Sequence, residues 1–286
     1  MVKLSVIILT FNTQKLTSRC VKSLINNYKK NIENGDMEII VADNGSEDDT
    51  ISTLTKVKDI KVVENKKNYG FSKGNNLGAK VSKGKYILFL NSDVEVEDNG
   101  FLSMIEFMDN NANVGILGGK LLNPDGSTQL STGNFYNFFS LLFTLFGADS
   151  LNRKKPNKIQ KVDWVSGASL MIRKDLFDNL RGFDENFFMY IEDMDLCFRA
   201  KKRGFSTYFW ENIKLIHKEL GSSNRSFAIL NIYKGIILFS KKHSGWQYPF
   251  IRFMLFLKAA ISILIGLLTN NSYLRKTYSG ALRIAI

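Results

Sequence analysis

The chain has 286 residues, and 44% of them are hydrophobic, so it can bury the core of one large domain or of a domain with an appendage. This composition excludes a disordered protein. Cys20 and Cys197, its two cysteines, lie far apart without metal-site spacing. This pattern disfavours a disulfide framework and a structural zinc site, and it fits a reducing compartment.

Charge is unevenly distributed along the chain, whose formal net charge is +12. Residues 221–286 contain nine Lys or Arg and no Asp or Glu, whereas residues 1–220 carry 30 basic and 27 acidic residues. A near-neutral body with a basic, apolar tail indicates an anionic partner for the tail. Nucleic acid and a membrane surface both fit that description.

Apolar runs of strand length alternate with helix-like stretches through the first 117 residues. The runs cover residues 5–9, 37–42, 60–63, 86–90 and 114–117, and the helix-like stretches cover 14–28, 47–56, 73–82 and 101–110. The first run lacks a small-residue cleavage site, so we interpret it as a buried strand rather than a signal peptide. The alternation predicts an α/β protein with a mainly parallel twisted sheet flanked by helices. Ligands of such sheets bind at the carboxyl ends of the strands.

Polar residues follow the first two predicted strands. Thr10 and Asn12 come after the first, and Asp43, Asn44 and Gly45 come after the second. An acid in such a turn can accept hydrogen bonds from a base or a ribose, and a glycine allows close backbone approach. The same residue types are also favoured in ordinary turns and helix caps, so a structural role stays open.

A loop punctuated by glycine and asparagine opens the third helix-like stretch. Its candidate residues are Asn68, Gly70, Phe71, Lys73, Gly74 and Asn75. Backbone N–H groups at a helix start bind anions, which suits a diphosphate, and the lysine would either neutralise phosphate or be solvated. Neither a G-x-G-x-x-G fingerprint nor a P-loop occurs, which disfavours dinucleotide reduction and NTP hydrolysis.

Two further segments place carboxylates after apolar runs. Asn91, Ser92 and Asp93 end the fourth strand, where an Asp can hold Mg²⁺ or Mn²⁺ or simply close the strand. Glu192 and Asp193 follow an aromatic run. Burial there would raise the pKa of a carboxylate and a nearby cation would lower it, and either change can produce a usable base. The alternative is a helix start, with the acids complementing the macrodipole and Asp195 paired with Arg199.

These segments, in this order, resemble the inverting glycosyltransferases of family 2, most closely their rhamnosyltransferase-like branch, over about residues 3–225. The resemblance implies a GT-A fold and assigns donor-binding roles to a set of loop residues. They are Thr10, Asn12, Asp43, Asn44, Gly45, Asn68, Gly70, Phe71, Lys73, Gly74, Asn75, Asn91 and Ser92. The D-x-D position reads Asn91-Ser92-Asp93, which leaves Asp93 as the carboxylate expected to meet the metal, Mg²⁺ or Mn²⁺.

The resemblance also assigns residues of the second half of the chain. Trp164, Ser166 and Gly167 resemble the segment that lines the donor sugar and the acceptor, and His217 resembles the residue that completes the metal site. Glu192-Asp193 resembles the motif that supplies the base, with Asp193 favoured over Glu192. The implied reaction is a direct displacement at the anomeric carbon of a nucleotide-diphosphate sugar.

We therefore expect a catalytic domain over residues 1–220 and a helical extension over 221–286. The extension is expected to lie on the inner face of the cell membrane of a cytoplasmic enzyme, so that a lipid-linked saccharide acceptor in cell-surface polysaccharide synthesis can reach the site. Arg252 and Lys258 interrupt the apolar stretch 250–268, which favours an in-plane helix over a spanning one. Packing of these helices on the catalytic domain or in a homo-oligomer is the alternative, and the phenylalanine-rich run 135–146 is either a second apolar contact or core.

Two other functions compete with this interpretation. A non-catalytic nucleotide-sugar-binding module would use the same loops, but it has no need of the clustered acids at 192–195. A nucleic-acid-binding protein fits the basic tail, but the cations of the tail alternate with long aliphatic runs, whereas nucleic-acid surfaces expose charge and stacking rings. We therefore expect no nucleic-acid partner.

Overall fold

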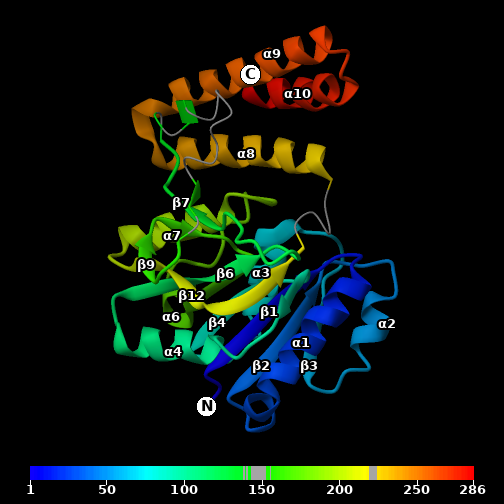
Figure 1. The fold of residues 1–286 in the computed structure, drawn as a ribbon, viewed down its shortest axis with the longest axis vertical. Helices are drawn as coiled ribbons and strands as arrows, with labels where there is room; N and C mark the ends of the chain where they lie inside the picture. Colours follow the sequence, from blue (N-terminus) through cyan, green and yellow to red (C-terminus); the bar gives the residue numbers. More distant parts are fainter. Residues whose placement is uncertain (138, 140, 143–152, 155, 219–223) are drawn as a thin grey trace.

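The computed structural model describes every residue except 138, 140, 143–152, 155 and 219–223 (Figure 1). Its strands are β1 Leu4–Thr10, β2 Met37–Asp43, β3 Ile60–Glu64, β4 Tyr86–Asn91, β5 Val94–Val96, β6 Val114–Leu122, β7 Thr132–Gly133, β8 Arg153–Lys154, β9 Gln160–Val162, β10 Trp164–Val165, β11 Ser169–Arg173 and β12 Ser206–His217. Its helices are α1 Gln14–Glu33, α2 Thr50–Leu54, α3 Gly70–Ala79, α4 Phe101–Asn110, α6 Lys174–Asn179, α7 Glu192–Lys202, α8 Arg225–His243, α9 Tyr248–Leu268 and α10 Ser272–Ala285.

The main sheet has the strand order β3-β2-β1-β4-β11-β6-β12-β5, with β9 paired to β12. The strands β3, β2, β1 and β4 run parallel, as do β6 and β12, and β11 is antiparallel to both of its neighbours. Thr10 is in register with Asp43, and Leu9 with Asn91. The carboxyl ends of β1, β2 and β4 therefore meet at one edge, and the predicted α/β class is confirmed.

Burial on both faces of the sheet explains the continuous apolar strands. Along β1, Ile7 joins one hydrophobic cluster, with side chains from α3, α6 and α7, whereas Val6 and Ile8 join the other, with side chains from α1 and α4. This alternation is the period of two expected for a strand between two helical layers. The sheet is therefore fixed in register, and its polar carboxyl edge is positioned by a packed core.

The first helices differ from the sequence prediction at their ends. α1 continues to Glu33 through a distorted backbone at Tyr28, the residue where the prediction ended it. α2 begins only at Thr50, because Asp43 bonds the N–H groups of Gly45 and Ser46 and holds the chain before it in a turn. α3 begins at Gly70, earlier than predicted. The spacing of hydrophobic residues does not indicate turn hydrogen bonds of this kind.

The C-terminal helices share the core of the sheet-containing body. α8 lies between that body and the pair formed by α9 and α10 (Figure 1). Ile236 and Phe239 of α8 belong to the same hydrophobic cluster as Phe177 and Leu196. Within the described residues, one helical stretch, Gly245–Leu268, is long and apolar enough to cross a membrane. Part of the phenylalanine-rich run 135–146 falls outside the described residues, but Phe135 and Leu141 are buried.

Candidate active site

Two cavities of about 310 Å³ each adjoin at the carboxyl edge of the sheet. We call the first the strand-end cavity, because the segments after β1, β2 and β4 line it, and the second the α7 cavity, because the start of α7 lines it. Phe71, Asn91, Asp93 and Met189 line both. The two cavities therefore form the two sides of one site.

The strand-end cavity contains about half of the residues expected to bind the donor. They are Thr10, Asn44, Asn68, Gly70, Phe71, Asn91 and Ser92. Amide side chains connect the loops after β2 and β3: the Asn44 Nδ2 donates to the Gly70 carbonyl at 2.9 Å, and Asn65 Nδ2 donates to Asn44 Oδ1 at 3.0 Å. At the end of β1, the Thr10 hydroxyl lies 2.7 Å from that of Thr17. This network fixes a polar cavity wall before any ligand binds.

Three other predicted donor residues hold the turn after β2 and lie outside both cavities. The buried Asp43 carboxylate accepts the N–H groups of Gly45 and Ser46 at 2.9 and 2.8 Å. Gly45 has φ +75°, and a Cβ there would lie 2.9 Å from Lys67 Cα, so the close approach is made by the protein's own backbone. Asn12 Oδ1 accepts the Glu47 N–H at 2.8 Å.

The three predicted donor residues on α3 also lie outside the cavities. A Cβ on Gly74 would lie 2.4 Å from Leu9 Cδ1, so this glycine lets α3 pack on β1. Asn75 Nδ2 donates to the Phe71 carbonyl within the helix at 3.0 Å. Lys73 pairs with Glu185 at 3.5 Å.

Two backbone N–H groups at the start of α3, where the glycines suggested an anion site, are bonded within the protein. Asn68 Oδ1 accepts the Gly70 N–H at 2.9 Å, and the Phe188 carbonyl accepts the Phe71 N–H at 2.6 Å. The first N–H groups of the helix are therefore already used by the protein. Hydrogen bonds from distant side chains and loops cannot be seen in the local sequence.

The residues expected to hold a metal lie where the two cavities meet. His217 Nε2 is 3.4 Å from Asp93 Oδ1 and 3.5 Å from Asn91 Nδ2. On the other side of the ring, Nδ1 lies 2.8 Å from Gln129 Oε1. Gln129 Nε2 donates to the carbonyl of His217 and to Asn123 Oδ1, both at 2.8 Å, which fixes the orientation of the amide. Nδ1 must then donate to Gln129, and Nε2 is the ring nitrogen that faces Asp93.

This arrangement fits a divalent cation. A carboxylate oxygen and an imidazole nitrogen face each other in a partly buried site, and the ring is held by a hydrogen bond from its other nitrogen, as in many metal sites. Among the described residues, no group of three or more His, Cys, Asp or Glu side chains gathers at a metal-binding distance. A cation here would therefore need its remaining ligands from water and from phosphate oxygens.

The other end of the site is formed by the start of α7. Tyr190 and Ile191, just before it, both have left-handed backbone, with φ of 72° and 71°. Asp193 Oδ2 accepts the Gly167 N–H at 2.9 Å, so the carboxylate lies against the segment expected to line the acceptor. Trp164, Ser166 and Gly167 all line the α7 cavity together with Asp193, Asp93 and His217.

Glu192 and Asp193 differ in their surroundings. Glu192 is 4% exposed, and its Oε2 has no hydrogen-bond partner among the described residues. Burial raises the pKa of Glu192 well above its usual value, and the neighbouring charge of Asp193 raises it further. The raised pKa favours the protonated form of Glu192, which suits a hydrogen-bond donor better than a base.

The sequence model of glycosyl transferase family 2 matches residues 5–180, more than half of the chain. The chain belongs to this family. It is 25% identical over 226 residues to the low-salt glycan biosynthesis hexosyltransferase Agl10 of Haloferax volcanii, covering 73% of this chain and 71% of that protein. It is 24% identical over 265 residues to N-acetylglucosaminyl-diphospho-decaprenol L-rhamnosyltransferase of Mycobacterium tuberculosis, covering 84% and 85%. A third relative, UDP-Glc:alpha-D-GlcNAc-diphosphoundecaprenol beta-1,3-glucosyltransferase WfaP of Escherichia coli, is 35% identical over 107 residues, covering 37% and 41%.

The protein is thus a rhamnosyltransferase-like glycosyltransferase of family 2, and its sheet with flanking helices is consistent with the GT-A fold that the resemblance implied. The family match ends before α7, so the candidate base, His217 and the C-terminal helices lie beyond it. Sequence reasoning missed Gln129, Met189 and Tyr190, and also the α8 residues Ala228 and Ile232, which line the glycosyltransferase site as well. Gln129 stands outside any periodic segment and gave no signal.

Proposed function

We propose that this glycosyltransferase moves a hexose, rhamnose or another, from a nucleotide-diphosphate donor to a hydroxyl of a lipid-linked saccharide, with inversion at the anomeric carbon. The strand-end cavity would take the nucleotide, and the α7 cavity would take the sugar and the acceptor. One observation carries the proposal: Asp93 lines both cavities, and Asp193 lies in the wall of the second. A diphosphate bridging the two would thus place its sugar on the side of Asp193.

Asp193 is the base in this proposal. Its carboxylate takes the proton of the acceptor hydroxyl as that oxygen bonds to the anomeric carbon, and the bond from that carbon to the diphosphate oxygen breaks with the electron pair leaving on the diphosphate. The Gly167 N–H holds Oδ2 of the carboxylate in place. Glu192 is buried beside it, and its raised pKa favours the protonated form, which can donate a hydrogen bond to a sugar oxygen.

Asp93 and His217 would hold Mg²⁺ or Mn²⁺, and Gln129 supports this role by orienting the His217 ring so that Nε2 faces Asp93. When bound, the cation would supply electrostatic stabilisation of the diphosphate leaving group. Asn91, at the first position of the motif, lies 3.5 Å from His217 Nε2 and contributes an amide where a second carboxylate would otherwise stand.

We place the enzyme at the inner face of the cell membrane. The names of two relatives specify diphospho-decaprenol and diphosphoundecaprenol substrates, which are membrane lipids. In this chain, the side of α9 that faces away from α8 and α10 exposes large apolar side chains, among them Phe253, Ile261, Leu264 and Leu268. Nine basic and no acidic residues in 221–286 favour an anionic surface.

A donor panel tests the proposed reaction. The full chain is incubated with UDP-glucose, UDP-galactose, UDP-N-acetylglucosamine and dTDP-rhamnose, each with Mn²⁺, Mg²⁺ or EDTA, with and without an undecaprenyl-diphosphate-linked N-acetylglucosamine acceptor. We expect one donor to release its nucleotide in a cation-dependent manner, and proton NMR of the product to show an inverted anomeric configuration. Retention of configuration, or no turnover with any donor, contradicts the proposal.

A further inference from the structure

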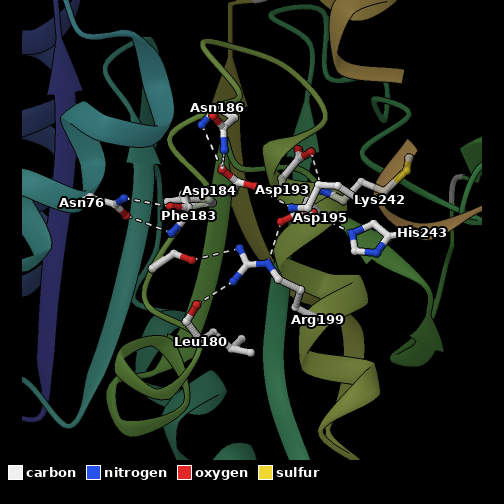
Figure 2. Close-up of polar contacts among 12 residues, drawn as sticks. Asn76, Leu180, Phe183, Asp184, Asn186, Asp193, Asp195, Arg199, Lys242 and His243 are labelled. Atoms are coloured by element: carbon white, nitrogen blue, oxygen red, sulfur yellow. Dashed lines mark hydrogen bonds and ion pairs between the residues drawn. The ribbon is translucent and has the colours of Figure 1, made fainter. Parts of the chain in front are cut away.

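The end of α8 meets the start of α7 at a buried carboxylate (Figure 2). Asp195, 0% exposed, accepts a hydrogen bond from Arg199 Nε at 2.6 Å, from Lys242 Nζ at 2.6 Å and from His243 Nε2 at 2.8 Å. Burial alone would raise the pKa of Asp195, but the bonds from His243 and Lys242 and the charge of Arg199 outweigh it and lower the pKa to about 2. Two of the three donors come from α8, which belongs to the C-terminal extension.

The same cluster holds the loop that leads into α7. Lys242 Nζ also bonds Asp184 Oδ2 at 2.6 Å, and Arg199 donates to the carbonyls of Leu180 and Gly182, both at 2.9 Å (Figure 2). The Asn76 side chain fixes the next residue of this loop, because it bonds both the N–H and the carbonyl of Phe183 at 2.9 Å. The loop is therefore anchored to α3, to α7 and to α8 before it reaches the strained turn.

α8 also contacts the turn itself. Tyr190 and Ile191 keep left-handed backbone, which non-glycine residues retain only where the surroundings determine it. Gly235 of α8 packs directly on this turn, because a Cβ there would lie 2.7 Å from Ile191 Cγ1 and 2.9 Å from the Tyr190 carbonyl oxygen. Asp193 follows two residues after the turn and two before Asp195, so both contacts with α8 flank it in sequence.

We propose that Lys242 and His243 are positioning residues: through Asp195 they hold the base helix α7 and its preceding turn in the geometry that aims Asp193 at the acceptor hydroxyl. The catalytic centre is therefore incomplete without α8, although α8 lies beyond the family match. The catalytic consequence rests on the proposed function, in which Asp193 is the base.

The test uses paired variants of the full chain. Lys242→Met and His243→Leu remove the donors, whereas Lys242→Arg and His243→Gln keep a donor at the same place. Lys241→Met is the control, because Lys241 is the adjacent exposed lysine and takes no part in the cluster. With the active donor from the panel, we expect the removal variants to lose about ten- to a hundredfold in kcat, with donor KM within about twofold of wild type, because misplacing a catalytic group affects turnover. The donor-keeping variants should recover most of the rate.

Hydrogen exchange of backbone amides gives a second readout that needs no turnover. We expect residues 186–194 to exchange faster in Lys242→Met and His243→Leu than in Lys241→Met, with protection of β1 and β4 unchanged. If one removal variant fails to fold, the other removal variant and its donor-keeping partner still test the proposal. Unchanged exchange and unchanged kcat overturn the proposal, as does a loss confined to donor KM. A wild-type protein without turnover would instead contradict the proposed function, and exchange would still decide the role of α8.

Discussion

At the scale of single residues, the site combines side chains that differ in how they are held. Asp193 accepts the backbone N–H groups of Gly167 and Met194, and His217 is held by a buried glutamine. Glu192 has an oxygen without a partner among the described residues. Burial that raises the pKa of Glu192 makes the two adjacent acids chemically different. Their sequence order alone could not distinguish them, because both stand at the same helix start.

Replacing Asp193 by Asn should reduce turnover and leave donor binding largely intact. The substitution removes the proton acceptor with little change of shape, so we expect kcat to fall by about 10² to 10⁴ and donor KM to change little. Initial rates over a range of donor concentrations measure both. A collapse of donor affinity with a normal saturated rate would make Asp193 a binding residue.

Replacing Asp93 by Ala should abolish transfer by removing the carboxylate that faces His217. Asn91 cannot replace it, since an amide brings no charge, so activity should fall by orders of magnitude and its dependence on Mn²⁺ or Mg²⁺ should change. Titration of activity with each cation, beside Glu95→Gln as a control on the neighbouring strand, provides the measurement. Near-normal turnover with unchanged cation dependence would exclude the metal assignment.

Glu192→Gln should change stability in a pH-dependent way. The pKa of Glu192 is raised in the folded protein, so the folded state retains a proton that the unfolded state releases above its own pKa near 4.5. The wild-type free energy of unfolding should therefore decrease relative to that of the variant as pH rises from about 5 to 8. Urea unfolding of both proteins at these pH values measures the difference. If the difference in free energy of unfolding stayed constant with pH, Glu192 would be ionised in the folded protein. A separate kinetic result, a loss of kcat in Glu192→Gln comparable with that in Asp193→Asn, would reopen the choice of base.

At the scale of elements, the sequence predicted what periodicity controls. The strands β1, β2, β3, β4 and β6 and the helix α4 were predicted because apolar runs and amphipathic spacing follow from burial between two helical layers. The late start of α2 and the bonded N–H groups at the start of α3 were not predicted. They depend on hydrogen bonds that the Asp43 carboxylate and the Phe188 carbonyl accept. For the same reason, seven predicted donor residues line a cavity and six support its walls. The role of α8 in the site could not be predicted from the sequence, because its contacts with α7 join residues far apart in the chain.

The tightness of the packing between α8 and the turn before α7 can be tested by adding one methyl group at Gly235. Gly235→Ala would place Cβ 2.7 Å from Ile191 Cγ1 and 2.9 Å from a backbone carbonyl, neither of which can move without disturbing the left-handed turn. We expect a loss of about 1–3 kcal/mol in the free energy of unfolding, the range for overpacking. Gly280→Ala is the matched control, since its Cβ would meet only the end of the Leu230 side chain, at 2.9 Å. Equal stability of the two variants would show that the turn is compliant.

At the scale of the whole molecule, the C-terminal helices contact the catalytic body on one side and leave an apolar face on the other. Ile251, Met254 and Leu255 of α9 are buried, whereas Phe253, Leu264 and Leu268 are exposed. Arg252 donates through Nε to the Ala285 carbonyl at 2.8 Å, so its guanidinium is bound at the C-terminal end of α10. The 21 residues of α9 could span about 30 Å, but a helix with one face packed on α8 and α10 is suited to lie in the membrane plane.

Membrane binding should therefore depend on the exposed face of α9. Phe253→Glu with Leu264→Glu should abolish co-sedimentation with liposomes containing anionic phospholipid, because each carboxylate would have to enter the apolar layer. Thr55→Glu with Leu102→Glu adds the same charge at exposed positions of the catalytic body and should bind like wild type. These surface variants keep Lys242 and His243, which a truncation near Ser240 would remove together with the apolar face. Alkaline carbonate should release the bound wild-type protein, since an in-plane helix has no span to retain it. Recovery of wild type in the supernatant with anionic liposomes at low salt would remove the membrane proposal, and resistance to carbonate would favour a spanning helix.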